Sequence, residues 1–219
     1  LALKEKQRQV TVVYQTEALM VWWNGLDHIW QAIFRNAIST QSERPNPLEL
    51  HQILDLRELE ITPEFPVVSI EPITNLMWLE RLTINNQRVS DLSPLEGKGF
   101  LVELNAQNNP VGSLKPIESS TMLELLNIEN TQVNDLGPLS KMNNLITLNA
   151  SGTSVKSLKP LSGLMKLEIL FVNNTNVRSI SPVENIPTLK QLRVYNTKVK
   201  KRDVEKLQQK RLDLNIIYY

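Results

Sequence analysis

Residue types that perform catalysis or hold metals are sparse in this chain of 219 residues. It contains two histidines, His28 and His51, and no cysteine. Thiol catalysis, disulfide bonds and cysteine metal sites are therefore excluded. The two histidines do not assemble a catalytic triad or a metal cluster with the residues around them. We interpret both as structural or surface residues.

Phosphate and cofactor chemistry is equally weakly supported. The segment Gly97-Lys98-Gly99 is rich in glycine but lacks the spacing of a phosphate-binding loop. Acidic residues are plentiful, but those in the repeats fall at generic outward positions, and the strands offer no base with an orienting partner. We therefore expect no catalytic residue, no metal, no cofactor and no enzymatic activity.

Charge is unevenly distributed along the chain. The net charge is +1, but residues 1–50 sum to zero, residues 51–189 to −5 and residues 190–219 to +6. The basic end comprises Lys198, Lys200, Lys201, Arg202, Lys206, Lys210 and Arg211. We interpret it as a solvated face; nucleic-acid or anionic-surface binding is the alternative, which lacks interleaved aromatic residues. We expect no nucleic-acid partner.

The ends of the chain and its hydropathy bear on location. No run of 18 apolar residues occurs, so we expect no membrane span. The first residue is Leu1 rather than methionine, which suggests that an upstream segment such as a signal peptide has been removed or omitted. A secreted or cell-envelope location is favoured over a cytoplasmic one.

A repeat of 22 residues must position any functional side chain. The phrase Leu-x-x-Leu-x-apolar recurs six times in one register, a valine stands at position 11 of each copy, and proline stands at position 16 of five copies. The copies begin at Leu79, Leu101, Leu123, Leu145, Leu167 and Leu189. Such a period indicates stacked units that bury their apolar faces only against one another.

The period continues beyond these six copies. An earlier copy of 23 residues has Leu56, Leu59 and Ile61 at the strand positions, with its extra residue within 62–69. A later copy begins at Arg211 and has Leu214 and Ile216 where the period requires apolar residues. We predict seven repeats and a closing strand.

These residues resemble the leucine-rich repeat family, in its short internalin-like or phosphatase-regulator-like form. The resemblance covers about residues 54–219 and implies an α/β solenoid: a right-handed superhelix with a parallel concave β-sheet and a short irregular convex side. Position nine departs from the family's asparagine, which only Asn109 keeps; Gln87 and four threonines replace it. Because asparagine occupies position eight in most copies, we expect two polar ladders that satisfy backbone groups in the turn.

Residues 1–53 are predicted to form a helical N-terminal cap, ahead of a repeat domain over 54–219. Helices are expected over 10–23, over 24–38 with Asn24 as N-cap and Asp27 in the first turn, and over 47–54 with Asn46 as N-cap. Three tryptophans, Trp22, Trp23 and Trp30, would cover the apolar end of the stack. At the other end, we expect Asp203 to cap a helix through Lys210, followed by a strand over 212–219.

Binding would use the outward strand positions three, five and seven, which are free of packing duties. Asn105, Asn127 and Asn149 would form an amide ladder with free donors and acceptors, and an apolar cluster of Leu125, Ile169, Phe171 and Tyr195 would be rimmed by Arg193. The predicted partner-binding residues are Arg81, Glu103, Asn105, Leu125, Asn127, Glu129, Asn149, Ile169, Phe171, Asn173, Arg193 and Tyr195.

An exposed aromatic and aliphatic cluster beside an arginine is typical of a protein-binding hot spot. The sequence therefore favours a non-enzymatic module that binds a protein partner on its concave face, and the resemblance to internalins suggests a bacterial cell surface. Carbohydrate or cell-wall binding is the alternative, and an intracellular regulatory scaffold is a second one. The cluster could also be incidental surface apolarity, or be covered by the strand over 212–219 or by a neighbouring copy.

Overall fold

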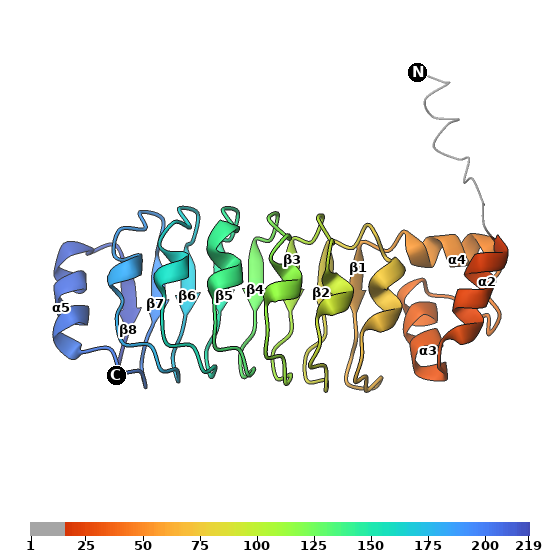
Figure 1. Ribbon diagram of the computed structural model, residues 1–219, viewed down its shortest axis with the longest axis horizontal. Coiled ribbons are helices and arrows are strands. Elements are labelled where there is room, and N and C mark those ends of the chain that lie inside the picture. Colours follow the sequence, from red (N-terminus) through yellow and green to blue (C-terminus); the bar gives the residue numbers. More distant parts are fainter. Residues whose placement is uncertain (1–15) are drawn as a thin grey trace, which may run out of the picture.

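A computed structural model describes residues 16–219 of the chain. Its centre is one sheet of eight parallel strands that lie side by side in chain order. Figure 1 shows an elongated stack with helices at both ends: α2, α3 and α4 beside β1, and α5 beyond β8. The strands are β1 (Glu58–Glu60), β2 (Arg81–Thr83), β3 (Glu103–Asn105), β4 (Leu125–Asn127), β5 (Thr147–Asn149), β6 (Ile169–Phe171), β7 (Gln191–Arg193) and β8 (Asn215–Ile217).

The register of the sheet follows the sequence period. Leu82 pairs with Leu104, and each later pair up to Leu170 with Leu192 is also separated by 22 residues. Leu59 pairs with Leu82, a separation of 23. Val67 donates to the side chain of Gln87 as Val89 does to that of Asn109, so the period is again 22 at that point. The extra residue of the first copy therefore lies between Thr62 and Val67.

Short 3-10 helices return the chain along the opposite side of the core. Each has proline in its first turn, where the missing N–H costs nothing and the fixed φ suits the bend. They are η1 (Glu71–Asn75), η2 (Ser93–Leu95), η3 (Lys115–Ile117), η4 (Gly137–Lys141), η5 (Lys159–Leu161) and η6 (Ser181–Val183). The short irregular convex side implied by the resemblance is confirmed.

Between the two sides lies a continuous apolar core. Leu104, Val111, Leu114 and Ile117 of one copy are each at most 1% exposed, and their counterparts in the neighbouring copies are equally buried. Burial of each such side chain contributes about 1.5–3 kcal/mol. Because each copy covers the core of the next, stability accumulates along the stack.

Two polar ladders occupy the turn after each strand, but only one of them serves the backbone. At position nine, Thr131, Thr153, Thr175 and Thr197 donate to the carbonyl three residues earlier, and Asn109 bonds to four backbone groups. At position eight, the asparagines bond to one another instead, for example Asn108 to Asn86 at 2.7 Å. Their role is conformational, because Asn86, Asn108, Asn130, Asn174 and Asn196 all have φ between 51° and 57°.

The closing strand is shifted by two residues from the predicted register. Leu192 pairs with Ile216, a separation of 24 rather than 22. The longer connection contains the helix α5 (Lys201–Lys210), whose Val204 and Leu207 are buried against the stack. Leu214 and Ile216 still face the core as predicted, because a shift of two residues preserves the face of a strand.

Two predictions at this end are wrong in detail. Asp203 lies inside the first turn of α5 rather than at its N-cap, which is Lys200 without a side-chain cap bond. Arg211 does not occupy the first position of a copy. Its guanidinium instead donates to the carbonyl oxygens of Ile186 at 2.9 Å, Pro187 at 3.3 Å and Leu189 at 2.9 Å, where the copy that begins at Leu167 passes into the copy that begins at Leu189.

The N-terminal helices pack against the first copy of the repeat. They are α2 (Thr16–Gly25), α3 (His28–Ala37) and α4 (Pro47–Leu54). Asn24 lies within α2, so its predicted capping role is wrong; Asp27 is the N-cap of α3 and accepts from the amide of Trp30 at 2.9 Å. The part of the predicted first helix over 10–15 lies outside the described residues.

Two of the three tryptophans that were predicted to cover the end of the stack are buried in the cap, and Trp22 is partly buried. Trp23 and Trp30 are 2% and 4% exposed, and the Phe34 ring lies 5.3 Å from that of Trp30. Asn46 caps α4 in a capping box with Glu49. The Thr40 hydroxyl and the Asn46 amide hold the pKa of Glu49 below its usual value. The division into a cap of residues 1–53 and a repeat domain of 54–219 stays a prediction.

Candidate functional site

The outward side chains of the strands form rows that run along the sheet. One row, at position five, passes through Asn105, Asn127, Asn149, Phe171, Arg193 and Ile217, which are register partners from strand to strand. A second row, at position three, passes through Arg81, Glu103, Leu125, Thr147, Ile169 and Gln191. Parallel strands lie about 4.8 Å apart, so neighbours within a row can contact one another.

The amide ladder is not free for ligands in the way the sequence suggested. Asn127 donates to the side chain of Gln107 at 3.0 Å and accepts from the amide of Glu129 at 3.1 Å. Asn149 repeats the arrangement one copy later, donating to Glu129 and accepting from Ser151. These amides connect one repeat with the next, so each has one of its two donors and one of its two acceptor sites already engaged.

Other predicted site residues are also committed within the protein. Asn173 is only 5% exposed and accepts from the Ser151 hydroxyl at 2.9 Å. Arg81 donates to Glu58 and also faces Glu103 at 3.4 Å. The two carboxylates raise the pKa of Arg81 above its usual value. The Oδ1 atoms of Asn85 and Asn105 are buried and have no partner among the described residues.

The apolar cluster lies on β6 and β7, where Phe171 and Arg193 replace the asparagines of the position-five row. The guanidinium carbon of Arg193 lies 4.0 Å from the centroid of the Phe171 ring, on the adjacent strand. Ile169 and Tyr195, on the same outward face, are partly exposed. Leu125 is also partly exposed but lies two strands away, separated from Ile169 by Thr147. The structure therefore brings Ile169, Phe171, Arg193 and Tyr195 together, and Leu125 less closely.

Sequence reasoning missed the contribution of the closing strand. In the shifted register, Ile217 is the partner of Arg193 in the position-five row. Tyr219 follows two residues later and is 92% exposed. The strand β8 thus lies beside β7 and continues the outward face, instead of covering it. The uninterrupted run Ile216-Ile217-Tyr218-Tyr219 signals apolar residues on both faces of this strand.

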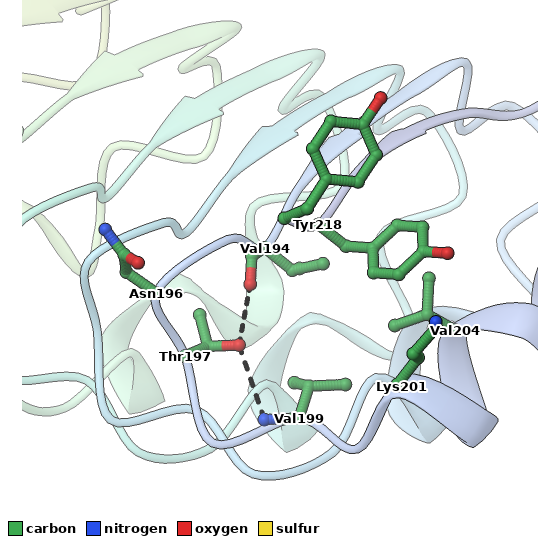
Figure 2. Close-up of a pocket in the computed structure, with 8 residues that line it drawn as sticks. Val194, Asn196, Thr197, Val199, Lys201, Val204 and Tyr218 are labelled. Atoms are coloured by element: carbon green, nitrogen blue, oxygen red, sulfur yellow. Dashed lines mark hydrogen bonds between the residues drawn. The ribbon is translucent and has the colours of Figure 1, made fainter.

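A small pocket lies next to this end of the sheet, between β8 and α5. Its volume is about 250 Å³. Figure 2 shows Val194, Thr197, Val199, Val204 and Tyr218 among the residues that line it. The Thr197 hydroxyl donates to the Val194 carbonyl at 2.7 Å and accepts from the Val199 amide at 3.3 Å. The Tyr218 and Tyr219 rings meet edge to face at 5.4 Å. The walls combine three valines with polar and aromatic side chains, namely Asn196, Thr197, Lys201, Tyr218 and Tyr219.

Metal-ligating residue types do not gather at one place in the described part of the chain. Within residues 16–219, no group of three or more histidine, cysteine or acidic side chains could hold a metal ion. His28 is exposed at the start of α3, and His51 is buried in α4. Across the same range, no helix has both the length and the apolarity needed to cross a bilayer.

Comparisons with known proteins agree with the architecture. The family described as Leucine Rich repeats (2 copies) matches residues 143–185. Among solved structures, an internalin, InlF, from Listeria monocytogenes has a TM-score of 0.77 at 21% identity; the match covers 96% of this chain and 60% of that one. Internalin C2 from the same organism has a TM-score of 0.76 at 20% identity, covering 88% of this chain and 93% of that one.

A leucine-rich repeat protein from Leptospira interrogans is more distant, with a TM-score of 0.63 at 19% identity over 77% of this chain and 50% of that one. No curated protein matches the sequence significantly. At these identities the solved structures establish the fold alone. The 22-residue phrase, the eight parallel strands and the family model that matches residues 143–185 show a leucine-rich repeat fold, which suggests a protein–protein interaction module.

Proposed function

We propose that this protein is a non-enzymatic recognition module that binds a protein partner through the outward strand face, centred on Phe171 and Arg193. The observation that carries the proposal is the stacking of the Arg193 guanidinium on the Phe171 ring at an exposed position of two adjacent strands. Aromatic residues and arginine are the types most enriched among residues that dominate binding energy.

The fold does not require these residue types at these positions. In the copies on β3, β4 and β5, the position-five residue is asparagine, and those copies stack equally well. Phe171 and Arg193 therefore depart from the pattern without a packing reason in the core. Exposed apolar area that folding does not demand is a hallmark of interaction surfaces.

The cluster is also pre-organised. The strands β6 and β7, which carry the two residues, are joined by backbone hydrogen bonds, including one from the amide of Val172 to the carbonyl of Arg193 at 2.9 Å. The Phe171 ring and the Arg193 guanidinium restrain each other, so binding orders few further rotamers. Arg193 has no ion pair within residues 16–219, which leaves its charge available for a carboxylate of the partner.

The remaining predicted residues would extend the surface toward β2. Arg81, Glu103 and Glu129 supply charge along the way, and Leu125 supplies apolar area. The engaged amides of Asn127 and Asn149 offer fewer donors to a sugar than the sequence suggested, and this favours a protein over a glycan as the partner. A secreted or cell-envelope setting, as the sequence suggests, would give such a surface access to partner proteins.

The experiment is an affinity capture from lysate and surface fractions of the native organism, comparing wild type with Phe171→Ala/Arg193→Ala. Met165→Ala is the matched control, because Met165 is 51% exposed and lies in a turn away from this face. Capture of one protein by wild type and by the control, but not by the double variant, supports the proposal. A partner kept by the double variant would contradict the site, and recognition only of arrayed glycans would contradict the partner class.

A further inference from the structure

A second apolar surface lies along the edge of the sheet where β2, β3 and β4 begin. Trp78, Phe100 and Met122 stand at the same place in three consecutive copies, 22 residues apart, immediately before the first residue of the strand phrase. They are 45%, 45% and 47% exposed, and neighbouring Met77 is 60% exposed. The Trp78 and Phe100 rings contact each other with centroids 5.1 Å apart. We refer to Met77, Trp78, Phe100 and Met122 as the edge ridge.

Stacking of the repeats does not require apolar residues in this column. In the next three copies the same position holds Asn144, Lys166 and Thr188. Asn144 donates to the Thr121 carbonyl at 3.0 Å, Lys166 donates to the Asn144 side chain, and Thr188 donates to the Met165 and Leu167 carbonyls. The column thus connects repeats through polar bonds in one half of the stack and exposes large apolar side chains in the other half.

The spacing of the edge ridge selects the shape of its occupant. Successive copies are about 4.8 Å apart across the sheet, in line with the contact between Trp78 and Phe100. An α-helix presents apolar side chains on one face at about 5–6 Å from one turn to the next. An extended strand repeats each face only every two residues, at about 6.6–7 Å. The spacing of side chains along a helix that lies parallel to the stack therefore matches the spacing of the edge ridge, whereas the spacing along a strand does not.

The charge beside the ridge selects the composition of that helix. Residues 71–124 contain seven carboxylates and four basic side chains. One of the basic groups, Lys98, is only 3% exposed and donates to the Thr74 carbonyl. Glu96 and Glu118 precede Phe100 and Met122 by four residues, and Glu124 follows Met122 by two.

These three carboxylates are exposed and available. They have no hydrogen bond or ion pair from their side chains within residues 16–219. Glu96 and Glu118 also line a groove of about 880 Å³ on the side of η2 and η3, together with Lys115 and Lys141. The surroundings of the ridge therefore carry a net negative charge and disfavour an acidic partner or an anionic bilayer.

We propose that the edge ridge is a docking site for an amphipathic helix of another protein, with apolar residues at i, i+3 or i+4, and i+7 and with flanking lysines or arginines. The apolar face of the helix covers Trp78, Phe100 and Met122, and its basic residues face Glu96, Glu118 and Glu124. This site lies at the edge of the sheet and is separate from the cluster of Phe171 and Arg193 on β6 and β7 (Figure 1).

The test is a selection of displayed random 18-residue peptides on wild type and on Trp78→Ser/Phe100→Ser. The Met165→Ser variant is the control, since Met165 is an exposed methionine of a later copy, at the position equivalent to Met77. Circular dichroism and urea unfolding first confirm that the variants are folded. We expect wild type and control to enrich basic peptides with apolar residues at helical spacing. The Kd of these peptides is expected to rise at least tenfold in the double variant and in Glu96→Gln/Glu118→Gln/Glu124→Gln.

Peptides that bind the wild type and the double variant equally would overturn the ridge as the site. Ridge-dependent peptides that are neutral, acidic or extended would overturn the proposed occupant. Sedimentation of wild type as a dimer that Trp78→Ser/Phe100→Ser converts to a monomer would assign the ridge to a second copy of the chain instead.

Discussion

The guanidinium of Arg193 lies 4.0 Å above the centre of the Phe171 ring, and the two residues are register partners on adjacent strands. Neither residue belongs to the repeat pattern that specifies the fold. The contact exists because the period of 22 places position five of each copy beside position five of the next. A departure from the pattern in two consecutive copies is thereby converted into one exposed surface feature.

This contact predicts a measurable coupling between the two residues. An exposed cation–π pair contributes about 0.5–1 kcal/mol. A double-mutant cycle with Phe171→Leu and Arg193→Met, measured by urea unfolding, should give a coupling free energy of that size. Additive effects of the two substitutions would show that the stacked geometry does not persist in solution.

Gly152 interrupts the asparagine ladder at position eight, and we expect two substitutions of this glycine to differ in their effect on stability. Gly152 takes the place of asparagine with φ of 68°, and a Cβ atom there would lie 2.1 Å from Oδ1 of Asn130. We expect Gly152→Ala to lower the free energy of unfolding by about 1–2 kcal/mol, because alanine is strained in the left-handed region. Asparagine adopts that region more readily and can join the ladder once Asn130 rotates, so Gly152→Asn should cost less. Urea unfolding of both variants makes the comparison, and equal losses would contradict this account.

We expect Arg211 to stabilise the C-terminal end of the sheet. Its guanidinium donates to the carbonyls of Ile186, Pro187 and Leu189 and to the carboxylate of Asp213. The bond between Arg211 and Asp213 raises the pKa of Arg211 and lowers that of Asp213. Arg211→Ala should lower the stability of the C-terminal end by about 1–2 kcal/mol. Arg211→Lys should recover only part of this loss, because lysine lacks the planar fork. Hydrogen exchange of the β8 amides measures the effect, and full recovery by lysine would mean that charge alone matters.

We expect that replacing the buried Lys98 with an apolar residue will stabilise the protein. Lys98 is 3% exposed, donates to the Thr74 carbonyl at 2.7 Å, and stands where other copies have Leu76, Met142 or Leu164. Because Thr74 is exposed, water can replace the lost donor. Lys98→Met should raise the free energy of unfolding near neutral pH by about 1 kcal/mol. Urea unfolding at pH 7 tests this, and a loss of stability would show that the lysine hydrogen bond outweighs its burial.

The same residue predicts a pH dependence with a definite sign. Burial lowers the pKa of Lys98, so between its folded value and the ordinary value of about 10.4 the unfolded chain binds more protons. The stability contributed by Lys98 therefore rises with pH in that range. The advantage of Lys98→Met over wild type should shrink as the pH rises above neutral toward 10.5 in parallel urea titrations. A constant or growing advantage would contradict the lowered pKa.

The sequence alone determined the architecture, because a repeat fold is specified by local rules. Leucine at positions one and four, valine at eleven and proline at sixteen each recur in one register, and stacking identical units leaves one arrangement of the strands. The helix over 47–54 was also predictable, since Asn46, Pro47 and Glu49 form a complete start signal.

Tertiary structure alone decided the features in which one segment depends on another. The N-cap of α3 is Asp27 rather than the predicted Asn24, because α2 continues to Gly25. The register of β8 differs from the predicted one because α5 lengthens the last connection by two residues. The strand pattern could not show that Asn127 and Asn149 bond to the preceding copy, or that Ile217 extends the face of Arg193. Periodicity fixes which face a side chain takes, whereas its partners depend on atoms contributed by other copies.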